Sequence, residues 1–165
     1  MRRRCVTVQR KGRYSRQEIA AAAVELRESA GGPTAVAFAF ITPDYAPYLE
    51  EFAEMVRVDG HVIELVGATG AGLTIDGEEN EDAGGFALLA LGAEEGTFEV
   101  TGFNQAKLEE STDLGFWRKL CRAKNPSAWI ALTNPFNFDT ERWLAEWNSA
   151  WPDIPCVGGL ASGSS

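Results

Sequence analysis

The chain has 165 residues, of which 45% are hydrophobic and 24% charged, and its formal net charge is −9. This length and composition are those of a globular domain with a substantial core. The acidic balance argues against nucleic acid as the main partner, because phosphate binding needs a basic surface. No stretch reaches the roughly 20 apolar residues of a membrane-spanning helix, so we expect no membrane partner and a cytoplasmic location.

The N-terminal segment is basic, with seven lysine and arginine residues between Arg2 and Arg16. We interpret it as a solvated tail, with a grip on RNA or anionic lipid as the alternative. Residues 1–33 are therefore expected to form a basic arm and a helix, both part of the same domain as residues 34–165.

A first strand–helix–strand unit follows. Ser15 and Glu18 form a capping box, which predicts that a helix over about 15–29 precedes this unit. The continuous apolar run 34–41 predicts a strand buried on both faces, 48–58 an amphipathic helix, and 61–66 a second strand. A glycine-rich loop comes directly after that strand.

The middle of the chain is expected to be less regular. Residues 75–83 are acidic and predict a solvated turn. Residues 84–91 are apolar and residues 97–103 alternate, so we expect these two strands to pair as a central antiparallel hairpin. A short helix is predicted at 114–123.

A second unit repeats the order of the first. Residues 127–133 predict a strand, Asp139 caps a helix over 140–150, and 154–157 predict another strand. A second glycine-rich loop follows, and its residues include Gly158.

The two units keep nearly the same register, which drifts by only a few residues. Gly67 and Gly158 are separated by the same 91 residues as Gly72 and Gly163. Strand–helix–strand crossovers give parallel strands. The predicted fold class is α/β, with a layered mixed sheet built from two similar β-α-β units and a central β-hairpin.

The two glycine loops are the candidate binding site, because ligands in such sheets lie beyond the carboxyl ends of strands. Glycine lets the backbone approach a ligand, and successive N–H groups can hold an anion. Neither loop matches the dinucleotide fingerprint, and tight turns that close two core strands are the alternative. The predicted ligand-binding residues of the loops are Gly67, Ala68, Thr69, Gly70, Gly72, Gly158, Gly159 and Ser162.

Residues that carry chemistry are few. His61 is the single histidine, and the cysteines Cys5, Cys121 and Cys156 are widely spaced. This set predicts free thiols, no metal site and no catalytic residue.

Four of the five tryptophans fall into two groups. Trp143, Trp147 and Trp151 recur at four-residue spacing, which predicts that they belong to the core. Trp117 with Phe116 is interpreted as an exposed patch that contacts a partner or the C-terminal half.

Several motifs resemble the FIST N-terminal domain family, and they come in the family's order. They are Val66–Gly72, Thr133–Asp139, Trp143-Leu144, Trp151-Pro152 and Val157–Ser162. The resemblance covers about Thr34 to Ser165. Asn134 stands where the family would have an acidic residue before Pro-Phe, and it completes the predicted ligand-binding set.

This resemblance implies a sensory domain for signal transduction that binds a small molecule such as an amino acid and has no catalytic activity. It also implies a C-terminal FIST half and an output partner such as a kinase or cyclase. Three alternatives stay open. They are a protein-interaction module without a ligand, a haem-based nitric-oxide sensor with His61 or a cysteine as axial ligand, and an α/β enzyme, for which the few titratable groups near the glycine loops are Asp44, Asp76 and the capping residue Asp139. No cofactor is predicted, and haem is the alternative.

Overall fold

The computed structural model describes residues 5–75, 78–80, 84–92 and 98–162. The fold is α/β with a mixed four-stranded sheet, as predicted. The chain divides into two compact units, which are described separately. The first contains the residues up to Phe98 together with Ser162, and the second begins at Glu99.

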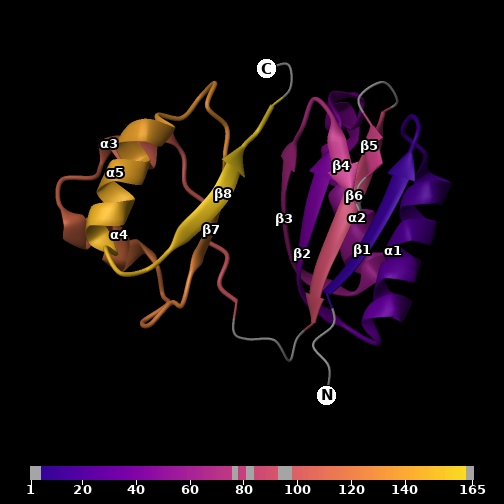
Figure 1. Cartoon of the computed structure of the whole chain (residues 1–165), viewed down its shortest axis with the longest axis horizontal. Coiled ribbons are helices and arrows are strands. Elements are labelled where there is room, and N and C mark those ends of the chain that lie inside the picture. Colours follow the sequence, from indigo (N-terminus) through magenta and orange to yellow (C-terminus); the bar gives the residue numbers. More distant parts are fainter. Residues whose placement is uncertain (1–4, 76–77, 81–83, 93–97, 163–165) are drawn as a thin grey trace. The chain divides into compact units, whose positions relative to one another are not determined.

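The sheet of the first unit sets the position of its loops (Figure 1). It contains β1 (Cys5–Lys11), β2 (Thr34–Ile41), β3 (Val62–Thr69) and β6 (Gly85–Gly92), in the order β1-β6-β2-β3. β2 and β3 are parallel, and β6 runs antiparallel to both β1 and β2. The carboxyl ends of β1, β2 and β3 therefore share one edge with the amino end of β6.

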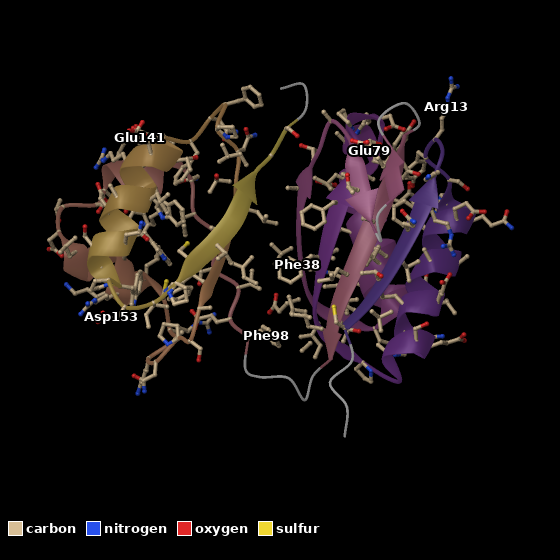
Figure 2. All side chains as sticks on the ribbon, viewed as in Figure 1. Arg13, Phe38, Glu79, Phe98, Glu141 and Asp153 are labelled. Carbon is tan, nitrogen blue, oxygen red and sulfur yellow. The ribbon has the colours of Figure 1, made fainter. Side chains whose placement is uncertain are left out.

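Two helices cover one face of this sheet, as Figure 1 shows. They are α1 (Arg16–Ala30) and α2 (Leu49–Gly60), and the 3-10 helix η1 (Pro43–Tyr48) leads into α2. The predicted cap is present, because the Ser15 side chain accepts a hydrogen bond from the Glu18 amide. The core between helices and sheet is built from Val8, Ile19, Ala22, Leu26, Ala37, Ala39, Ile41, Tyr45, Phe52, Val56, Val62, Phe86, Leu88 and Ala90. Figure 2 shows Phe38 on the opposite face.

Two expectations for the first unit are wrong. The N-terminal segment is not a solvated tail where it is described, because Cys5–Lys11 forms strand β1. β1 pairs with β6, whereas the sequence predicted that the strand over 84–91 pairs with a strand over 97–103. The described part of that segment, residues 98–103, contains no strand, and Thr97 lies outside the described residues. β1 needs only one apolar face, and Val6 with Val8 supplies it.

A short hairpin lies where a solvated turn was expected. It consists of β4 (Leu73–Ile75) and β5 (Glu78–Asn80), which pair antiparallel. The acidic residues Asp76, Glu81 and Asp82 of that segment lie outside the described residues.

The second unit is built around aromatic side chains. Its elements are α3 (Gln105–Glu109), α4 (Leu114–Leu120), β7 (Trp129–Thr133), α5 (Thr140–Ala150) and β8 (Cys156–Leu160), and β7 pairs in parallel with β8. The Asp139 side chain caps α5, as predicted. Trp143 and Trp147 are buried and Trp151 packs against them, which confirms their place in the core.

The expectation for Trp117 is wrong, because this side chain is 0% exposed. Its ring contacts Phe103, Phe116 and Trp147. Its indole N–H donates to the Glu146 carboxylate at 2.9 Å. A residue on a seven-residue helix can face the core as easily as the solvent, and the spacing of one aromatic pair does not distinguish the two.

Glu146 is predicted to make the second unit sensitive to acid. Burial raises the pKa of this carboxyl, but hydrogen bonds from Ser111, Trp117 and Arg142 outweigh it and the pKa is lowered. A lowered pKa in the folded state stabilises the fold above the pKa of the unfolded chain, about 4.3, and this contribution is lost as the pH falls through the folded-state pKa.

We therefore expect Glu146→Gln to be less stable than the unmodified chain at pH 7, with a difference that shrinks below about pH 4. Urea unfolding followed by tryptophan fluorescence at both pH values measures it. The exposed Glu141→Gln on the same helix is the control. A difference between Glu146→Gln and the unmodified chain that stays constant with pH would contradict the assignment.

Candidate functional site

A cleft of about 560 Å³ opens in the first unit at the edge formed by the carboxyl ends of its strands. Its lining residues are Arg13, Tyr14, Asp44, Tyr48 and Gly84. Arg13 and Tyr14 follow β1, Asp44 and Tyr48 belong to η1 after β2, and Gly84 precedes β6. In open α/β sheets, ligands bind at this kind of edge.

Hydrogen bonds to the backbone fix the segment of the cleft wall that carries Arg13. Gly12 adopts a φ of 124° that only glycine takes readily, and its N–H donates to the Gly84 carbonyl at 2.6 Å. The Tyr45 hydroxyl lies 3.2 Å from the carbonyl oxygens of both Gly12 and Arg13. The Arg13 side chain is exposed and extends outward from this wall (Figure 2).

An aromatic pair forms another part of the lining. Tyr14 stacks on Tyr48 with ring centroids 4.0 Å apart and an interplanar angle of 19°. The Tyr14 hydroxyl donates to the Glu51 carboxylate, which also pairs with Arg16 at 3.0 Å. Burial, then the bond to Glu51 and its charge, raises the pKa of Tyr14 to about 12. Tyr14 therefore stays a protonated donor at neutral pH, and Arg16 balances the charge of Glu51.

A hydrogen bond from Thr42 holds the Asp44 carboxylate in place. The buried Thr42 hydroxyl donates to it, and the Thr42 oxygen accepts the Gly85 N–H at 2.8 Å. A Cβ atom at Gly84 would overlap the Asp44 carboxylate, so glycine at this position lets the carboxylate approach the backbone.

Thr42 gives a direct test of this geometry. Thr42→Val is expected to lower the free energy of unfolding by about 1–3 kcal/mol, because the buried Gly85 N–H loses its acceptor. Thr42→Ser keeps the hydroxyl and is expected to cost about 1 kcal/mol. Urea denaturation and hydrogen exchange at the Gly85 amide measure both. Equal stability and equal exchange in the two variants would contradict the role given to the hydroxyl.

The first predicted glycine loop is largely strand. Gly67, Ala68 and Thr69 belong to β3, and a Cβ at Gly67 would overlap the carbonyl oxygen of Ala39 on β2. The Gly70 N–H donates to Ile41 O at 2.9 Å. Gly67, Gly70 and Gly72 do not take positive φ values. Close strand packing therefore accounts for Gly67, and the Gly70 amide is already bonded.

Ser162 is the predicted residue that the structure brings to this loop. Its N–H donates to Thr69 O at 3.0 Å, and its hydroxyl oxygen accepts the Ala71 N–H at 3.2 Å. The two hydroxyl-bearing residues of the predicted site are thus neighbours.

The remaining predicted residues lie in the second unit. Gly158 and Gly159 belong to β8, and a Cβ at Gly158 would overlap the backbone of Ala131 on β7. The Asn134 side-chain oxygen accepts the Phe136 N–H at 3.0 Å, which closes an Asx turn. The ligand role of this set stays a prediction.

Sequence reasoning missed most of the lining of the cleft. Arg13 and Tyr14 follow a segment whose sequence is typical of a solvated tail, and this hid their position at the sheet edge. The usable signal was the turn Thr42-Pro43-Asp44 directly after a buried strand, which places a carboxylate where ligands bind.

The structure gives the surroundings of His61 and of two of the cysteines. His61 is exposed at the C-terminal end of α2, and its Nε2 lies 3.4 Å from the Arg27 guanidinium, which does not fit an axial ligand in an apolar haem pocket. Burial, then the charge of Glu99, raises the pKa of Cys121 to about 11, and burial also raises the pKa of Cys156. Among the described residues, no group of three His, Cys, Asp or Glu side chains could hold a metal ion.

Comparison with known proteins gave one match. A family model described as FIST N domain matches residues 35–165. No curated protein and no solved structure matches the chain. In the part of the chain that the structure describes, no helix has the length and apolar character needed to cross a membrane.

Proposed function

Because this chain belongs to the FIST N domain family, a family of sensory domains in signal transduction, we propose that it senses a small zwitterionic molecule such as an amino acid. The proposed site is the cleft of the first unit. The observation that supports it is a pair of opposite charges in one cleft, because Arg13 and Asp44 both line it and neither has an ion-pair partner among the described residues.

The chemistry of the two side chains suits an α-amino acid. A guanidinium presents a planar set of donors that matches a carboxylate. A carboxylate accepts hydrogen bonds from an ammonium group. The hydrogen bond from the Thr42 hydroxyl already fixes the orientation of the Asp44 carboxylate. One molecule with both charges satisfies both residues, whereas a simple anion or cation satisfies one.

Isothermal titration with chemically blocked amino acids tests the proposal. L-alanine is expected to bind saturably, whereas N-acetyl-alanine lacks the ammonium and alanine amide lacks the carboxylate. Each blocked compound is expected to bind at least about tenfold more weakly, since each loses a hydrogen bond between charged groups. Equal binding of the three compounds, or no binding of any, would contradict the proposal.

A protein-interaction role is a second candidate, and an exposed apolar face supports it. Ile130, Val157 and Leu160 on the two-stranded sheet of the second unit are each more than half exposed. Parallel strands are usually covered on both faces. The partners proposed from the sequence are an output protein, such as a kinase or cyclase, and the C-terminal FIST half. Loss of binding to such a partner in Val157→Asp, with amino-acid binding intact, would support this role.

We also propose that the domain is cytoplasmic and has no catalytic activity. The raised pKa values of Cys121 and Cys156 support the second point, because the protonated thiol is a poor nucleophile.

A further inference from the structure

We infer that the cleft selects amino acids with a flat apolar side chain, aromatic ones above all. This inference rests on the proposed function, because it assumes that Arg13 and Asp44 hold the carboxylate and ammonium groups of the ligand. It concerns the group that these two charges leave unassigned, the ligand's side chain.

The part of the lining that remains for that side chain is aromatic. After Arg13 and Asp44, the cleft is lined by Tyr14, Tyr48 and the backbone of Gly84. Tyr48 is 46% exposed although it stacks on Tyr14, so its ring keeps accessible surface. Aromatic rings favour stacked or edge-to-face contact with other rings beyond the gain from burial alone.

The surrounding charges do not favour a charged side chain. Glu51 is the carboxylate next to the tyrosine pair, and it already has Arg16 and the Tyr14 hydroxyl as partners. Among the described residues that line the cleft, an acidic or basic ligand side chain would therefore find no unpaired group of opposite sign once Arg13 and Asp44 are occupied. A neutral ring loses no such partner.

The aromatic pair is also fixed before a ligand arrives. The Tyr14 hydroxyl is bonded to Glu51, and Tyr45 holds the backbone of the same wall. A rigid aromatic surface loses little conformational freedom on binding, which favours a flat ligand group.

Isothermal titration of the unmodified chain with glycine, L-phenylalanine, L-glutamate and L-lysine tests the selection. Phenylalanine is expected to bind about tenfold more tightly than glycine, since partial burial of its ring contributes roughly that factor. Glutamate and lysine are expected to stay within about threefold of glycine, since they lack that ring contact.

Two variants locate the effect. Tyr48→Leu is expected to reduce the phenylalanine-to-glycine affinity ratio to about three or less, since it removes the ring contact, whereas Tyr48→Phe keeps the ratio. Val58→Ala, an exposed change on α2 away from the cleft, is the control. Circular dichroism confirms that each variant is folded.

The outcomes separate this inference from the proposed function. If glycine and phenylalanine bind equally, or if glutamate or lysine binds most tightly, the inferred preference for aromatic side chains is wrong. The proposed amino-acid site at Arg13 and Asp44 then still stands. If the ratio survives in Tyr48→Leu, the selecting surface is not this tyrosine and the inference is overturned. If none of the four binds, both the inference and the proposed function fail.

Discussion

Replacing Trp117 with alanine is expected to lower the free energy of unfolding of the second unit by about 3–5 kcal/mol, the usual cost of removing a fully buried tryptophan. The side chain is 0% exposed and contacts three other aromatic rings. The loss also leaves the Glu146 carboxylate without one of its donors. Most side chains of this core are aromatic rings, and the surrounding structure closes the cavity left by a truncated side chain only in part.

Urea unfolding followed by far-UV circular dichroism, with hydrogen exchange read separately over residues 99–161, measures this loss. Trp117→Phe keeps a ring and removes the N–H, so it is expected to cost about 1–2 kcal/mol. Trp151→Ala, at a half-buried position, is expected to cost less than Trp117→Ala. A Trp117→Ala variant with unchanged exchange in the second unit would contradict its place in that core.

Replacing Asp44 with alanine is expected to weaken amino-acid binding by about 10–150-fold, the range for loss of a hydrogen bond to a charged group. Asp44→Asn keeps the shape and one acceptor oxygen but not the charge, so most of the loss is expected there too. Asp44→Ala also removes one of the two acceptors within reach of the Thr42 hydroxyl, and its stability is therefore measured alongside its affinity.

Glu50→Gln supplies the matched control for this change. Glu50 is an exposed carboxylate in the first turn of α2, but it does not line the cleft. Its replacement removes the same unit of charge from the same region and is expected to change affinity by less than about twofold, as exposed charges are well screened. Equal losses in Asp44→Ala and Glu50→Gln would show that only net charge matters and would exclude a specific contact.

The sequence predicted the parts of the fold that depend on local signals. The buried strand over 34–41, the capping box at Ser15 and the Asp139 cap all rest on patterns within a few residues, and all three are present. Such signals are strong because burial on both faces and unsatisfied helix N–H groups each demand particular residue types nearby.

The missed features depend on contacts between distant segments. β1 has one apolar face and basic ends, so its sequence alone is as typical of a tail as of an edge strand; only pairing with β6 makes it a strand. The cleft follows from that pairing, since it brings Arg13 beside Asp44 and Gly84. Gly67 is a similar case, because the sequence does not distinguish a glycine needed for close strand packing from a glycine that contacts a ligand.

The most direct test of the account is a titration of the unmodified chain with L-phenylalanine. The backbone amide signals of the nuclear magnetic resonance spectrum are recorded at each ligand concentration. If the cleft is the amino-acid site, saturable shifts of the amide signals are expected to concentrate at Arg13, Asp44, Tyr48 and Gly84. Shifts confined to Gly67–Gly72 and Gly158–Ser162 would contradict the cleft and return the site to the glycine loops. An unchanged spectrum at saturating ligand would contradict an amino-acid sensor altogether.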